Sequence, residues 1–446
     1  MSNGAPAAGR TDAARPRLVR AMGRWDLTAL TVNGVIGSSI FGMPAVLAAL
    51  TGAWSPLAVL LGALGILVIV LCHAEVGSRF REPGGTYLYA REAFGGFVGF
   101  QAGWLGFWIR VTSMGANLNV FVNYLSELAP AVARPFGRAS TMALVTALVT
   151  VINLRGVRQG ARTVDLFAVA KILPLALLVL LGIWHIRADV LATQAVAAPD
   201  WTQAFLLLVF AYGGFEAALV PAGEVREPRR DAAFSLLVAL GIVAAIYMLV
   251  QLSVVGLVPN AASARAPVAA AYGVLLGGVG ITLASVAAMI STYGWTVGSV
   301  LSSPRILYSM SERGDLPAWL AHVHARFRTP DVAILAYALA GLLFALSGGF
   351  AANATISAIV RLLTYGLVCA SLVALRRRSG VEPPAFRLRA GGLVAAVGVL
   401  FCLWLVSTRT FTQAWILIAL VALGAVLWWA AGRGRNRGRD RVAPAV

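Results

Sequence analysis

The sequence predicts an all-α integral membrane protein with about twelve transmembrane helices. Of its residues, 59% are hydrophobic and 12% are charged, whereas about a quarter of the residues are charged in ordinary soluble domains. The apolar residues form blocks of roughly 17 to 25, the length that crosses a bilayer core of about 30 Å as a helix. A soluble chain of 446 residues could not bury so many apolar helices, so we expect a membrane protein.

The apolar blocks define the candidate spans in chain order. We expect them at roughly 26–50, 55–79, 95–127, 139–155, 163–186, 202–223, 232–258, 268–302, 331–348, 352–376, 392–408 and 412–431. Residues 1–24 are polar and rich in Ala, Pro and Arg, and we expect no cleavable signal peptide there. This segment and the basic segment 432–446 are predicted to be disordered cytoplasmic tails.

The net charge of +18 comes from arginines that are distributed unequally between alternate loops. With the N-terminus inside, the cytoplasmic loops carry Arg79, Arg81, Arg91, Arg155, Arg158, Arg162, Arg226, Arg229, Arg230, Arg305, Arg313, Arg326, Arg328, Arg376, Arg377, Arg378, Arg387 and Arg389. The opposite loops carry Arg134, Arg138, Arg187, Arg265 and Arg409. This asymmetry is typical of topology control and not of phosphate binding, so we expect no nucleic-acid partner. It predicts a multi-pass protein of the cytoplasmic (inner) membrane with both termini in the cytoplasm.

Two spans contain glycine-rich interruptions. The first includes GVIGSSIFG at 34–42, and the sixth includes FAYGGFE at 210–216. Glycine weakens a helix by about 1 kcal/mol relative to Ala, and breaks in lipid persist only where they are buried in protein or line a wet cavity. Close helix packing through small residues could explain the glycines alone. Two breaks five spans apart favour an inverted-repeat transporter with its substrate site at the bilayer midplane.

Four blocks of sequence resemble a known family. They are GVIGSSIFGMP at 34–44, PGGTYLYAREAFG at 83–95, FAYGGFE and GEVREPRR between 210 and 230, and SPRILYSM at 303–310 with Gly314 and Pro317. Their order over residues 26–376 resembles the amino acid–polyamine–organocation (APC) superfamily of amino acid permeases. One departure is Ser39, which stands where the family commonly has the second glycine of Gly-Ser-Gly. Its side chain is expected to narrow the room near the substrate backbone.

The resemblance implies the LeuT-like fold, with broken helices one and six and alternating access around a central site. It implies a first inverted repeat of five spans at 25–190, a second at 200–378, and two peripheral helices at 390–431. The implied function is secondary active transport of amino acids or related amines, with proton symport favoured over sodium symport. Amino acid exchange is the alternative within transport. A membrane amino acid sensor that does not transport is the alternative from another class, but both tails are short and low in complexity.

The breaks also suit the chemistry of an amino acid, which presents a carboxylate and an ammonium. A half-helix that begins at Ser38 or Ser39 offers free N–H groups and a positive dipole end to the carboxylate. By resemblance, the carboxylate meets the backbone of the first break and the ammonium meets carbonyls near Val35 and Phe210. Phe210 is either an aromatic gate over the substrate or a core residue. The expected substrate-binding positions are Val35, Gly37, Ser38, Ser39, Ile40, Phe210, Ala211, Tyr212, Gly213 and Gly214.

Lys171 is the only lysine of the chain and lies within the fifth span. It is about nine residues into the span, or about 13 Å deep at 1.5 Å per residue, which is close to the depth of the first break. Unlike an arginine, a buried lysine can release its proton at accessible pH. In the proton-coupled members that the chain resembles, a fifth-span lysine replaces a sodium ion. We expect Lys171 to couple protons and to contact first-span carbonyls and Ser291 or Thr292; the alternative is a lysine that reaches the membrane surface.

Three further charged residues lie inside spans, where ionisable groups are functional candidates. Glu216 follows the sixth-span break and either senses protons or ties the broken helix by accepting backbone N–H bonds. Arg110 and Arg361 lie near the middle of spans three and ten. Each either pairs structurally, with Glu216 or with carbonyls, or receives a second negative group on the substrate.

The sequence contains no pattern that predicts an enzyme. It has no Ser/His/Asp arrangement, phosphate loop or paired-carboxylate motif. The three cysteines, Cys72, Cys369 and Cys402, lie in apolar runs far from metal-ligand spacing. We therefore expect no metal site and no cofactor.

Overall fold

The computed structural model describes residues 22–80, 84–156, 161–219, 225–378, 380 and 382–440, and over these the chain is all-helical. The only strand-like contact among them is an isolated bridge between Met22 and Val225. The elements used below are α1 (Arg24–Val35), α2 (Ser39–Thr51), α3 (Ser55–Gly77), α4 (Gly85–Phe94), α5 (Gly96–Leu128), α6 (Pro135–Leu154), α7 (Ala161–Gly182), α8 (Ala188–Thr193), α9 (Trp201–Ala211), the 3-10 turn η4 (Phe215–Leu219), α10 (Pro228–Leu257), α11 (Pro267–Ser302), α12 (Pro304–Glu312), α13 (Asp331–Ser347), α14 (Phe350–Arg377), α15 (Gly391–Ser407) and α16 (Phe411–Asp440). The predicted all-α fold class is confirmed.

Six stretches within the described ranges are long and apolar enough to cross a membrane. They are Ser39–Gly77, Pro135–Leu154, Pro228–Leu257, Pro267–Glu312, Phe350–Arg377 and Gln413–Gly432. Four shorter apolar helices are Lys171–His185, Trp201–Ala211, Asp331–Ser347 and Gly391–Ser407. α5 has 33 residues but is not among the six, because Arg110 and several polar residues lower its hydropathy. These helices fit the predicted multi-pass membrane protein.

Parts of several predictions fall outside the described residues. These are the N-terminal tail up to residue 21, the last six residues, Pro83, Gly223 and Glu224 of the quoted motifs, and Arg81 and Arg158 of the loops expected to be cytoplasmic. The structure differs from the expected disorder of 432–446 where it describes that segment, because α16 continues as a helix through Asp440. A helix that has already formed extends at little cost, and arginine is a good helix former.

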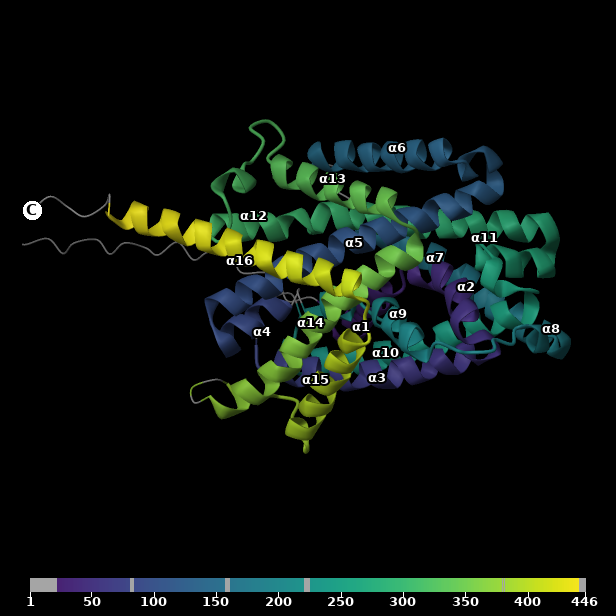
Figure 1. Cartoon of the computed structure of the whole chain (residues 1–446), viewed down its shortest axis with the longest axis horizontal. Helices are drawn as coiled ribbons and strands as arrows, with labels where there is room; N and C mark the ends of the chain where they lie inside the picture. The colour runs from purple at the N-terminus through teal and green to yellow at the C-terminus, as the bar shows by residue number, and fades with distance from the viewer. Residues whose placement is uncertain are drawn as a thin grey trace, which may run out of the picture.

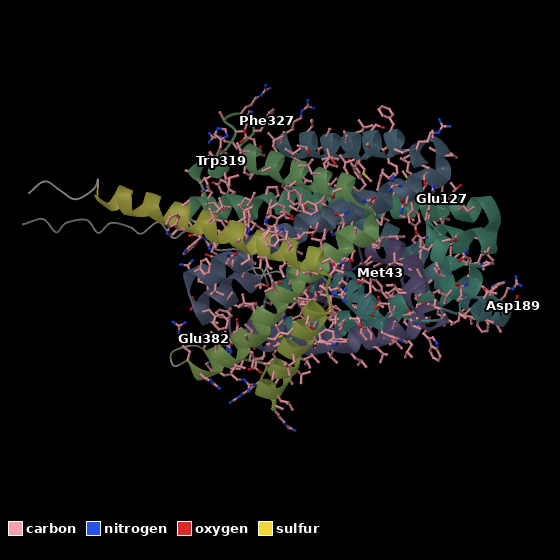
Figure 2. The ribbon with its side chains drawn as sticks, in the orientation of Figure 1. Met43, Glu127, Asp189, Trp319, Phe327 and Glu382 are labelled. Atoms are coloured by element: carbon pink, nitrogen blue, oxygen red, sulfur yellow. The ribbon has the colours of Figure 1, made fainter. Side chains whose placement is uncertain are left out.

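Most long helices run along the long axis of the molecule, so the bundle has two ends (Figure 1). α4 and α12 lie at one end, which we call the α4 end, and α8 lies at the other, the α8 end. Figure 2 places Trp319, Phe327 and Glu382 at the α4 end and Glu127 and Asp189 toward the α8 end. Two of the arginine-rich loops expected to be cytoplasmic, 313–328 and 376–389, therefore lie at the α4 end.

The interrupted helices α1 and α9 pack against long continuous helices. α5 packs against α11, α13 and α14, and α10 packs against α1 and α3. α14 also contacts α9, and α11 contacts α7. The first and sixth predicted spans, each of which is interrupted, thus lie between helices that can supply them with polar side chains.

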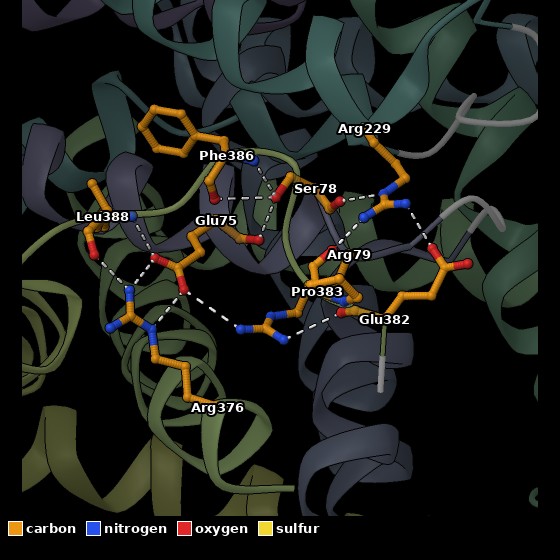
Figure 3. Close-up of polar contacts among 9 residues, drawn as sticks. All are labelled: Glu75, Ser78, Arg79, Arg229, Arg376, Glu382, Pro383, Phe386 and Leu388. Carbon is orange, nitrogen blue, oxygen red and sulfur yellow. Dashed lines mark hydrogen bonds and ion pairs between the residues drawn. The ribbon is translucent and has the colours of Figure 1, made fainter. Parts of the chain in front are cut away.

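A polar network surrounds Glu75 at the end of α3, and its carboxylate is fully buried (Figure 3). Arg376 donates to both oxygens of Glu75, at 2.7 and 2.6 Å. Arg229 of α10 donates to the carbonyl of Ser78 at 2.8 Å and pairs with Glu382 at 2.8 Å. Bidentate charge-assisted bonds of this kind are strong and directional. They fasten the segment between α14 and α15 to the end of α3.

Candidate functional site

The first span is broken between α1 and α2. α1 ends at Val35, Ile36 has extended backbone angles (φ −71°, ψ 94°), and α2 begins at Ser39. The last carbonyls of α1 and the first N–H groups of α2 therefore lack partners within their own helices. The N–H groups of Ser39 and Ile40, expected to meet a substrate carboxylate, lie in this first turn of α2. A methyl group at Gly37 would meet the Trp295 side chain at an ordinary contact distance of 3.6 Å.

Lys171 of α7 contacts the end of α1. Its Nζ donates to the carbonyls of Asn33 at 2.8 Å and Ile36 at 2.7 Å, and the residue is 6% exposed. A cation suits this position because the C-terminal end of a helix carries partial negative charge. The expected contact with α11 is absent among the described residues: Thr292 donates to a carbonyl one turn earlier in its own helix (2.7 Å), and the buried Ser291 hydroxyl has no hydrogen-bond partner. Threonine commonly back-bonds within helices in this way.

Tyr247 of α10 joins the two breaks and was not identified from the sequence. Its hydroxyl lies 2.8 Å from Oγ of Ser39 and donates to the carbonyl of Val35 at 3.1 Å. Ser39 also reaches the carbonyl of Ala211 at 3.4 Å. The Ser39 side chain is thus buried and engaged with protein atoms. The carbonyl of Val35, at a predicted substrate position, accepts one hydrogen bond and keeps a second lone pair. The carbonyl of Ala211 is approached by two hydroxyls, those of Ser39 and of Tyr247 at 3.3 Å.

The second break follows α9. α9 ends at Ala211, and Gly214 has φ of +112°, a conformation that L side chains rarely adopt. A methyl group on Gly214 would lie 2.5 Å from the carbonyl oxygen of Gly34, so the two breaks touch at this point. The Tyr212 hydroxyl donates to the carbonyl of Val59 at 2.9 Å, which fastens the second break to α3.

Glu216, directly after the second break, holds the broken backbone and an arginine together. One carboxylate oxygen pairs with Nη1 of Arg361 at 2.5 Å. The other accepts from the N–H of Gly214 at 2.9 Å and from the Tyr365 hydroxyl at 3.1 Å. The Arg361 guanidinium lies against Gly213, where a methyl group would come within 2.5 Å of it. This geometry corresponds to structural pairing for Arg361 and to a helix tie for Glu216.

Phe210 lies one residue before the end of α9, next to the second break. Its ring meets that of Phe350 edge to face, with centroids 6.0 Å apart, and both residues are buried. Phe350 in turn lies against Gly42, where a methyl group would meet its ring at 3.0 Å. Phe350 begins α14, and no signal in the sequence distinguishes it from an ordinary core aromatic. The pair thus contacts both interrupted spans, Phe210 through α9 and Phe350 through Gly42 of α2.

Arg110 lies on a cavity of about 520 Å³ that reaches from the α4 end to the second break. α4, α5, α11, α12 and α14 contribute to its walls, with exposed Arg305 and Arg313 toward the α4 end and Glu216 beside the break. Unlike Arg361, the guanidinium of Arg110 donates no hydrogen bond to any described residue. The structure thus separates two arginines that the sequence could not distinguish.

Comparison with known proteins finds similarity to a permease family and to transporters. The family model described as Amino acid permease matches residues 22–431. The chain is 29% identical to the serine/threonine exchanger SteT of Bacillus subtilis over 384 residues, which cover 80% of this chain and 83% of that protein. It is 28% identical to the large neutral amino acids transporter small subunit 2 of Homo sapiens over 363 residues, covering 78% of this chain and 68% of that protein. It is also 29% identical to an uncharacterized transporter of Mycobacterium tuberculosis over 396 residues, covering 86% of this chain and 85% of that protein.

Proposed function

Since this chain belongs to the amino acid permease family of the APC superfamily and is an amino acid transporter rather than an enzyme, we propose that it is a proton-coupled secondary active transporter. Its substrates are amino acids or related amines, carried across the cytoplasmic membrane by alternating access. The single observation that carries the coupling is the pair of hydrogen bonds from Lys171 to the end of α1.

The proposed architecture has twelve spans in a five-plus-five inverted repeat with two peripheral helices. In support, the first and sixth spans are both broken, at 36–38 and 212–214, and the two breaks touch. α15 and α16 follow as the peripheral pair. Both termini are proposed to be cytoplasmic, which fits the position of two arginine-rich loops at the α4 end.

The substrate backbone is proposed to bind between the two breaks. The first N–H groups of α2 lie at the positive end of the helix dipole and therefore suit a carboxylate. The carbonyl of Val35 retains a lone pair for an ammonium, whereas that of Ala211 is already approached by the hydroxyls of Ser39 and Tyr247. Phe210, packed on Phe350, is proposed to cover this region.

Lys171 couples protons in this proposal through the position of α1. The protonated side chain neutralises the negative end of α1 and fixes it by two short hydrogen bonds to Asn33 and Ile36. After proton release the charge is gone, so α1 is held less tightly and can move relative to α7. Alternating access requires such a two-state element, which both substrate and proton can bias.

Uptake into proteoliposomes with an imposed pH gradient tests the proposal. The purified chain should accumulate labelled amino acids when the gradient drives protons in the direction of uptake, and Lys171→Gln should abolish that accumulation. Arginine keeps a permanent charge, so Lys171→Arg should abolish it too. Gradient-driven accumulation by Lys171→Arg would rule out a proton carrier at this position while leaving a structural role intact.

Amino acid exchange is the second candidate, because one relative is named a serine/threonine exchanger. Uptake into empty and amino-acid-loaded proteoliposomes separates the two. A symporter takes up substrate into empty vesicles, whereas an obligate exchanger requires substrate on the inside.

A further inference from the structure

The cavity at the α4 end contains a cationic side chain that the transport proposal does not use. Arg110 lies near the middle of α5, about fourteen residues from its start at Gly96. Its backbone carbonyl accepts a bond from Tyr337 at 3.1 Å, which fixes the helix, while its guanidinium donates to no described residue. An arginine in a membrane span that finds no protein partner must face water or a ligand.

Arg110 interacts electrostatically with Glu216 in the cavity but forms no side-chain hydrogen bond with it or with any other described residue. The carboxylate that shares its cavity, Glu216, uses both oxygens on Arg361, Tyr365 and the backbone. The other cations of the cavity wall are Arg305 and Arg313, which are exposed near the mouth. The deep end of the cavity therefore carries excess positive charge inside a mostly apolar wall.

The deep end also adjoins the proposed path of the substrate. Glu216 lines the cavity and binds the N–H of Gly214, which in turn touches Gly34 of the first break. The volume of about 520 Å³ lies within the range of about 300–1,000 Å³ typical of small-molecule sites. A ligand released from the breaks toward the α4 end would meet Arg110 first.

We propose that Arg110 binds the side-chain carboxylate of an acidic amino acid, so that the transporter accepts dicarboxylic amino acids. A guanidinium matches a carboxylate with two parallel hydrogen bonds, and the low dielectric of the cavity strengthens them. The inference rests on the proposed transport function and names the substrate class of the same path.

Glutamate and glutamine provide a matched pair of probes, because they differ by one charged group at nearly constant shape. Uptake of labelled L-glutamate and L-glutamine is measured in proteoliposomes that contain the full chain. We expect the wild-type protein to take up glutamate. Arg110→Gln should lower the ratio of glutamate to glutamine uptake about 10- to 100-fold, the range for losing hydrogen bonds to a charged group.

Two further variants control this measurement. Arg265→Gln removes the same charge from an exposed arginine near the α8 end and should leave the ratio unchanged. Arg110→Lys keeps the charge but loses the planar guanidinium that binds a carboxylate with two hydrogen bonds. Its ratio of glutamate to glutamine uptake should therefore fall less than that of Arg110→Gln. The melting temperature of each variant shows whether it is folded.

Three outcomes would overturn the inference, and they differ in what they leave standing. If the wild-type protein takes up neutral amino acids but neither glutamate nor aspartate, the inference about Arg110 fails and the proposed transport function stands. An equal loss of glutamate and glutamine uptake in Arg110→Gln also overturns it alone, because Arg110 would then contact the substrate backbone or the fold. Uptake of no amino acid by the wild-type protein would overturn the proposed function as well.

Discussion

The two helix breaks are supported by cations from neighbouring helices, but in different ways. At the first break, Lys171 donates directly to two backbone carbonyls at the end of α1. At the second, Arg361 pairs with Glu216, and the carboxylate in turn caps the N–H of Gly214. One break thus depends on a charge that can be removed by deprotonation, and the other on an ion pair whose cation stays charged.

This difference assigns mobility to one break and rigidity to the other. The C-terminal end of α1 carries a partial negative charge. Lys171 compensates this charge when it is protonated and leaves it uncompensated when it has lost its proton. The second break is tied by three hydrogen bonds on Glu216 and by close packing of Arg361 on Gly213. We infer that α1 is the element that moves when the proton leaves, while the second break serves as a fixed reference.

The largest effect should follow from removing the cation of the second break. Arg361→Met leaves the partly buried Glu216 carboxylate without its hydrogen-bonded ion-pair partner, and breaking a buried pair from one side costs up to about 3–5 kcal/mol. The free energy of unfolding in detergent should fall by that amount. The double variant Arg361→Met with Glu216→Gln removes both charges and should recover most of the loss. A double variant as unstable as the single one would contradict the ion pair as the source of stability.

The next largest effect should come from the glycine at which the breaks touch. Gly214→Ala places a side chain at φ of +112° and a methyl group 2.5 Å from the Gly34 carbonyl. Strained backbone and overpacking together should cost about 2–4 kcal/mol, measured as a shift of the unfolding midpoint. A cost below about 0.5 kcal/mol, the range of unconstrained surface changes, would show that the breaks are not in tight contact here.

A smaller effect should follow from cutting the hydroxyl that bridges the breaks. Tyr247→Phe removes the bonds to Val35 and Ser39 and should destabilise by about 1–2 kcal/mol. Ser39→Ala should cost less, because it leaves the bond between Tyr247 and Val35. A double-mutant cycle with both changes should give a coupling energy of about 0.5–1 kcal/mol, as for directly bonded residues. Additive effects of the two substitutions would mean that the Ser39–Tyr247 bond contributes no stability.

The residues differ in how far the sequence could predict their roles. The breaks were visible because glycine-rich runs interrupt apolar spans, and the depth of Lys171 matched that of the first break because both follow from helix rise. The partner of Arg361 is 145 residues away in the chain, so only tertiary packing reveals it. Arg110 and Arg361 look alike in sequence, since each is a single arginine in mid-span. Tyr247 and Phe350 read as core aromatics, because no local pattern separates a bridging hydroxyl or a covering ring from ordinary packing.

Substitution of Gly37 in the first break should change stability least, which makes it the counterpart of Gly214→Ala in the second break. Its φ is not positive, and a methyl group there would meet Trp295 at 3.6 Å and the carbonyl oxygen of Val35 at 4.0 Å, both ordinary contact distances. We therefore expect Gly37→Ala to change the free energy of unfolding by less than about 0.5 kcal/mol. Its effect should appear in transport, because the added methyl group occupies space beside the first turn of α2. A raised KM for substrate with unchanged stability would locate the substrate at the mobile break. A loss of stability equal to that of Gly214→Ala would instead show that both breaks are packed equally tightly, and the division into a mobile and a fixed break would fail.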